Sequence, residues 1–159
     1  ERGFTKDIRS KMYRLTVEVI KDYPIAGIGF GMEIYGNPKL VPLDQYNLQL
    51  PPEYRQRNTV VASPHSTFLD IAVRTGLVGL MLFMYILLSA VWMLWKTFKL
   101  DRENDWRSWA IYLLAGLTSF VLLSAFADAM YGPKAIVFYT ILAMITILWN
   151  LVRPNQANP

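Results

Sequence analysis

The 159-residue sequence has no cysteine, a single histidine, and three long stretches without any charged side chain. The absence of cysteine excludes a secreted scaffold held together by disulfides. With 53% hydrophobic and 14% aromatic residues, the composition also excludes intrinsic disorder, a coiled coil and collagen. The charge-free stretches are 75–95, 108–127 and 135–152. Each has the roughly 20 residues that a helix needs to cross a bilayer. We therefore expect an all-α membrane protein with three transmembrane helices in residues 75–152.

Most charged side chains lie before residue 75, so a polar segment, 1–74, precedes the three apolar stretches. Residue 1 is not methionine, and no charged start followed by a short apolar stretch and a cleavage site is present. We therefore expect a C-terminal fragment of a larger membrane protein, whose upstream segments supply further site residues.

The polar segment begins with a helical pattern and continues as a long loop. Apolar side chains recur at helical spacing from Ile8 to Val19, with charged residues between them. This pattern predicts an amphipathic helix over 7–22, ended by Pro24, that packs on its own domain or lies along the membrane surface. Repeated prolines and tyrosines over 24–64 predict an ordered, irregular loop with little regular structure and a functional role.

A second helix is predicted to start beside the histidine. Thr67 and Asp70 have capping-box spacing, which predicts a helix start near Ser66 or Thr67. This helix is expected to run straight into the first apolar stretch. Gly76 and Gly79 lie about one turn apart on it and predict close packing against a neighbouring helix.

Short loops indicate the orientation under the positive-inside rule. The first loop between apolar stretches contains four basic residues and the second contains one. They are Lys96, Lys99, Arg102 and Arg107 in the first loop and Lys134 in the second. We therefore expect the first loop and the tail, 153–159, in the cytoplasm, and segment 1–74 on the outer side.

The strongest candidate for a catalytic or phosphate-binding residue is His65, which lies where the outer loop meets a helix start. The free N–H groups and the dipole of that helix favour an anion, and an imidazole there can bind phosphate or accept a proton from a hydroxyl. Arg9, Arg55 and Arg57 lie in the same segment and can hold phosphate in bidentate fashion. The residues alone leave a structural alternative open, in which His65 only caps the helix and the arginines are solvated.

Two linked motifs resemble the O-antigen ligase and polymerase superfamily of bacterial inner-membrane proteins. That family has histidine, then Asn, Ser or Gln, then nine residues and G-x-x-G. The matching residues here are His65, Ser66, Gly76 and Gly79. Upstream, Arg9 with the aromatic Tyr13 four residues later, followed by the glycine-rich segment 22–31, is similar to the start of the family's large periplasmic loop.

The resemblance implies a fragment of a GT-C-type glycosyltransferase bundle in the inner membrane. It implies a polyprenyl-diphosphate-linked glycan as donor and a glycan or lipid A core as acceptor, with neither cofactor, metal nor nucleic acid. Carried over by position, His65 and Arg9 are the candidate catalytic residues. His65 is the base for the acceptor hydroxyl or a proton partner in the site, and Arg9 is the ligand of the diphosphate. Ser66 and the two glycines of the motif are structural. Arg55 and Arg57 match no motif position, and their expected contact with the diphosphate rests on charge and location.

Three positions depart from the family pattern. Tyr13 stands where tryptophan is common, Ser66 where asparagine is commonest, and Arg74 where an acidic residue is often found. As a cation near the bilayer edge, Arg74 is expected to extend toward the membrane surface or to contact a lipid phosphate.

Several activities remain open within and outside this resemblance. An O-antigen ligase, a polysaccharide polymerase and a protein O-glycosyltransferase differ only in the acceptor. A non-catalytic membrane component of polysaccharide export would keep the fold without the chemistry. A transporter or channel is disfavoured, because its pathway needs ionisable residues inside the spans and the three apolar stretches contain none.

Overall fold

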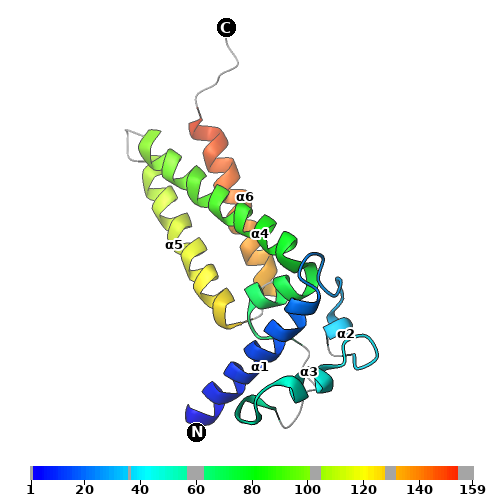
Figure 1. Ribbon diagram of the computed structural model, residues 1–159. Helices are drawn as coiled ribbons and strands as arrows, with labels where there is room; N and C mark the ends of the chain where they lie inside the picture. The colour runs from blue at the N-terminus through cyan, green and yellow to red at the C-terminus, as the bar shows by residue number, and fades with distance from the viewer. Residues whose placement is uncertain (1, 36, 57–62, 101–104, 128–131, 154–159) are drawn as a thin grey trace. The chain divides into compact units, whose positions relative to one another are not determined.

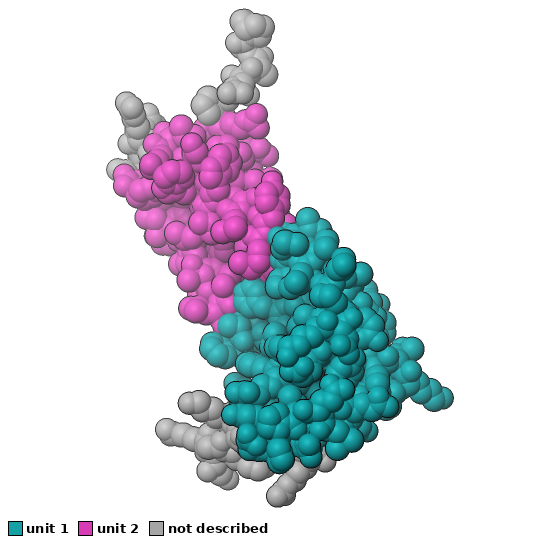
Figure 2. Space-filling model, viewed as in Figure 1, with its two compact units in different colours: residues 1–82, 124–128 teal, residues 83–123, 129–159 magenta. Residues whose placement is uncertain are grey.

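The computed structural model describes residues 2–35, 37–56, 63–100, 105–127 and 132–153, and all regular structure in these ranges is helical. The chain forms two compact units, coloured separately in Figure 2. Unit 1 comprises residues 1–82 and 124–128, and unit 2 comprises residues 83–123 and 129–159.

Unit 1 begins with the long polar helix α1 (Arg2–Asp22), drawn in blue in Figure 1. The following segment contains α2 (Met32–Tyr35), α3 (Leu43–Gln49) and a 3-10 turn, η1 (Pro52–Tyr54). The expectation of little regular structure over 24–64 therefore needs correction. These helices are one or two turns long, too short for apolar periodicity to reveal them, and they form because tertiary packing buries their apolar side chains.

A single apolar core joins α1 to the short helices and to the start of the next long helix. Leu15 and Val19 of α1 are buried in it, so α1 packs on its own domain through its apolar face. The other buried members of this core are Tyr35, Val41, Leu43, Tyr46, Leu50 and Val73.

Three further helices are long and apolar enough to cross a membrane: α4 (Thr67–Leu100), α5 (Asp105–Phe126) and α6 (Pro133–Val152). The expected all-helical membrane fold with three spanning helices is thereby confirmed. One detail differs. Helix α4 does not run straight, because Gly76 has φ 67° and ψ −171° and interrupts it.

Unit 2 is held by aromatic packing between its helices. Phe138 of α6 stacks on Phe120 of α5 at 4.5 Å between ring centroids and lies 5.9 Å from Phe83 of α4. Near the end of α4, the Lys99 ammonium lies 4.0 Å from the centre of the Trp95 ring. Aromatic rings paired with cations at a helix end are typical of a membrane interface.

Candidate active site

The single histidine of the chain lies exposed on the turn that leads into α4. Pro64 before it and Ser66 and Thr67 after it are buried, so the backbone is held on both sides. His65 has a φ of 51°, and its backbone N–H donates to Ser63 Oγ at 3.2 Å. A left-handed conformation at a residue other than glycine costs about 1 to 3 kcal/mol and is kept only where its surroundings impose it. Such an imposed turn is a feature of functional sites.

Both α4 and α1 are attached to the short segment at the end of α5. The Thr67 backbone N–H and hydroxyl donate to the Ala127 carbonyl at 3.2 and 2.8 Å. On α1, the Tyr13 hydroxyl donates to the Ala125 carbonyl at 3.4 Å. Arg9 lies one turn before Tyr13 on the same face of α1. The two motif segments, distant in sequence, are therefore held against one stretch of three residues.

The glycine-rich loop, residues 24–31, is hydrogen-bonded to α4 where that helix is interrupted. The bonds run from Ile28 N–H to the Val73 carbonyl, from Gly29 N–H to the Arg74 carbonyl and from Leu77 N–H to the Pro24 carbonyl, with N···O distances of 2.9, 2.9 and 2.8 Å. An interrupted helix leaves backbone groups without partners in its own ladder. The loop supplies hydrogen-bond partners for these groups, so the loop is fixed to the helix at its interruption.

Two glycines allow these backbones to meet. Gly27 and Gly76 have φ values of +68° and +67°, and a Cβ on Gly76 would overlap the Ile25 carbonyl. A Cβ on Gly79 would overlap the side chain of Thr75, one turn earlier on α4. At Gly76 the close neighbour is therefore the glycine-rich loop and not a helix, and at Gly79 it is Thr75 of the same helix, so packing of Gly79 against a neighbouring helix stays a prediction.

A buried ion pair lies in the first turns of α4. Arg74 Nε donates to Asp70 Oδ1 at 2.8 Å, and the two side chains are only 2% and 5% exposed. The Arg74 guanidinium also donates to the Gly31 carbonyl. The expected extension of Arg74 to the membrane surface is therefore wrong. The sequence carried a signal for this pair, since opposite charges stand four residues apart on one helix beside an apolar span.

The three arginines that are candidate ligands of the diphosphate differ in exposure and hydrogen bonding. Arg9 is exposed on α1. The Arg55 Nε and Nη2 atoms donate to the Leu50 and Leu48 carbonyls, both at 2.8 Å, where α3 ends. Arg57 lies outside the described residues. Arg55 therefore stabilises the end of α3, and its contact with a diphosphate stays a prediction.

Two buried tyrosines fasten the short helices to α1. Thr16 Oγ1 donates to the Met12 carbonyl and lies 2.7 Å from the Tyr35 hydroxyl, which donates to it. Burial raises the pKa of Tyr35 to about 12. The Tyr46 hydroxyl donates to Asp22 Oδ2 at 2.7 Å, and desolvation followed by this bond raises the pKa of Tyr46 as well.

The described residues contain no group of three or more metal-ligating side chains.

A comparison with known families finds that the model of the family described as O-antigen ligase matches residues 1–84, more than half of the 159-residue chain. The match includes both motif segments. No curated protein and no solved structure matches the chain. On this evidence, the chain belongs to the O-antigen ligase family.

Proposed function

We propose that the full-length protein transfers a glycan from a polyprenyl-diphosphate-linked donor to a sugar acceptor at the periplasmic face of the bacterial inner membrane. One observation carries the proposal: the turn bearing His65 and the helix bearing Arg9 are both hydrogen-bonded to the C-terminal end of α5, through the Ala127 and Ala125 carbonyls. Family membership supports glycosyl transfer of the ligase or polymerase type.

In the proposed reaction, the acceptor hydroxyl oxygen attacks the anomeric carbon of the donor, and the bond from that carbon to the diphosphate oxygen breaks. His65 takes the hydroxyl proton, since an imidazole exchanges protons near neutral pH. The guanidinium of Arg9 and the positive end of the α4 dipole stabilise the charge on the departing polyprenyl diphosphate. Arg55 and Arg57 are further candidate ligands of that diphosphate, proposed on charge and sequence position.

The distance of the histidine from the membrane supports a lipid-linked donor. The apolar part of α4 begins at Thr75, ten residues after His65. At the rise of an α-helix, this spacing corresponds to about 15 Å along the axis, and a tilted helix shortens the height. The diphosphate of a lipid-linked glycan lies in the polar layer next to the hydrocarbon core, within reach of such a site.

The experiment that tests the proposal replaces His65 by glycine in the full-length protein in its source cell. Glycine adopts a φ of 51° without strain, so His65→Gly removes the imidazole while keeping the turn. The length of accumulated polyprenyl-diphosphate-linked glycan is then compared with that in cells carrying the unchanged protein at equal membrane expression. Long chains identify a ligase and single repeats a polymerase. Normal levels would overturn the proposal and leave His65 as a structural residue.

A protein O-glycosyltransferase would differ in the acceptor alone. It would lose glycan from a protein, and the same His65→Gly cells would reveal it by the missing glycoprotein. A non-catalytic component of polysaccharide export would instead tolerate the substitution.

A further inference from the structure

The glycine-rich loop exposes its largest apolar side chains. Ile25 is 72% exposed and Phe30 is 85% exposed, and the loop, residues 24–31, contains no charged residue. Single exposed apolar residues are ordinary on a protein surface. Two large ones on an uncharged loop form an apolar surface that indicates an interaction partner.

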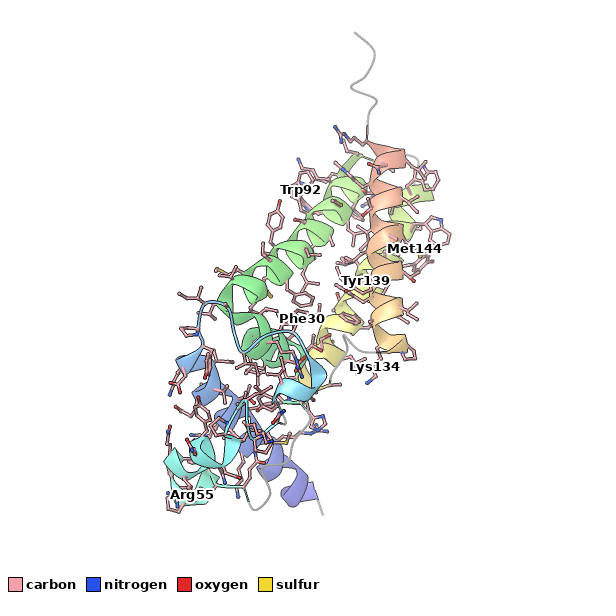
Figure 3. The ribbon with its side chains drawn as sticks, turned by 90° about the vertical axis from the view of Figure 1, so that its right-hand side faces the viewer. Phe30, Arg55, Trp92, Lys134, Tyr139 and Met144 are labelled. Carbon is pink, nitrogen blue, oxygen red and sulfur yellow. The ribbon has the colours of Figure 1, made fainter. Side chains whose placement is uncertain are left out.

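This surface is continuous with the side of α4. The Pro24 carbonyl accepts the Leu77 N–H, which sets the start of the loop level with the first apolar turn after the interruption of α4. Ile25 and Phe30 line a shallow cavity of about 380 Å³ together with Val78 of α4. Figure 3 shows Phe30 beside the first part of α4. Because α4 is long and apolar enough to span a membrane, the loop lies where the chain enters the hydrocarbon.

Several backbone groups of the loop are paired within the protein, as irregular structure at a membrane requires. Lipid cannot hydrogen-bond to exposed N–H and C=O groups, so a loop that enters it must pair them within the protein. The N–H groups of Ile28 and Gly29 are bonded to α4, and that of Gly27 donates to the Tyr23 carbonyl at 3.2 Å. The Gly31 carbonyl accepts from Arg74.

The charge next to this surface is also neutralised. Arg74 lines the same cavity, but its guanidinium is paired with Asp70 and its side chain is 2% exposed. The apolar surface therefore borders a compensated ion pair, which removes the main electrostatic obstacle to its insertion into lipid.

We propose that the glycine-rich loop is inserted into the leaflet that α4 enters, with Ile25 and Phe30 in contact with lipid acyl chains. The loop is hydrogen-bonded to residues 73, 74 and 77 of α4, so its insertion fixes the depth of α4 in the membrane. It thereby sets the height of His65 above the surface. This inference does not depend on the proposed reaction.

The test measures lipid contact at single positions of the full-length protein in lipid nanodiscs. Residues 1–159 contain no cysteine, so Phe30→Cys in a protein cleared of any other cysteine gives one fluorescent label. Leu88→Cys, 63% exposed in the middle of α4, serves as the lipid control. Leu48→Cys, 65% exposed on α3, serves as the matched control outside the loop. Its carbonyl binds Arg55, which Figure 3 shows at the far end of unit 1 from Phe30.

Two quenchers distinguish the outcomes, a nitroxide on the lipid acyl chain and iodide in the water. We expect the label at Phe30→Cys to lose most of its fluorescence to the nitroxide and little to iodide, as at Leu88→Cys, while the label at Leu48→Cys shows the reverse. Strong iodide quenching at Phe30→Cys would mean that the loop lies in water. Protection from both quenchers would mean that another protein segment covers it. Either result overturns the proposal.

Discussion

The buried pair between Asp70 and Arg74 makes a quantitative prediction about stability. Replacing Arg74 by methionine leaves the Asp70 carboxylate 5% exposed without its cation, and breaking a buried pair costs about 3 to 5 kcal/mol. The same change removes the bond to the Gly31 carbonyl, which adds roughly 1.5 to 3 kcal/mol because the donor is charged. Arg74→Met is therefore expected to cost at least about 4.5 kcal/mol, comparable with the whole stability of many domains.

The double variant tests this reasoning. Combining Arg74→Met with Asp70→Ala removes the unpaired charge, so the double variant is expected to be about 3 kcal/mol more stable than Arg74→Met alone. Thermal unfolding of the detergent-purified full-length protein, followed by the folded fraction in size-exclusion chromatography, ranks the two single variants and the double variant. If the stability losses of the two single variants simply add in the double variant, Asp70 and Arg74 do not stabilise the fold as a pair.

Three further predictions concern the loop and its supports. Gly76→Ala is expected to abolish stable folding, because alanine would have to adopt a φ of +67° and its Cβ would overlap the Ile25 carbonyl. In the control Gly116→Ala, the new Cβ meets its nearest neighbour at 3.6 Å, so the yield of folded protein is expected to stay unchanged. Neutral Tyr35 stabilises the fold below pH 10, and this contribution, roughly 3 kcal/mol for a pKa near 12, is lost as the pH rises toward 12. Chemical unfolding measured across this pH range should show a smaller loss of stability in Tyr35→Phe than in the unchanged protein. Arg55→Ala removes two hydrogen bonds to carbonyls at the end of α3, so faster amide hydrogen exchange is expected over residues 43–56. Unchanged exchange together with weaker binding of the lipid-linked glycan donor would instead identify Arg55 as a diphosphate ligand.

The spanning helices were predictable because charge has a large cost inside a bilayer. Stretches such as 135–152 carry no charged residue, and the helices follow from length and composition alone. The interruption at Gly76 was not predictable in the same way. A glycine within an apolar stretch is compatible with a straight helix, and the loop that meets it lies more than forty residues earlier in the chain.

The candidate site was likewise predictable from the sequence only in part. His65 and Arg9 stand out by residue type and motif position, and their importance remains a prediction. The pairing of Asp70 with Arg74 is readable from spacing, but its burial and the bond from Arg74 to the distant Gly31 carbonyl are not. Arg55 illustrates the weakness of assigning a role from charge alone, since two of its guanidinium nitrogens bind carbonyls of its own segment.

The most direct test of the central proposal is the initial rate of glycan transfer from a polyprenyl-diphosphate-linked donor by the purified full-length protein in lipid nanodiscs. His65→Gly is compared with the unchanged protein after both show the same thermal unfolding midpoint. The rate of His65→Gly is expected to fall by about 10²-fold to 10⁴-fold, the usual contribution of a general base. A His65→Gly rate close to that of the unchanged protein would contradict it.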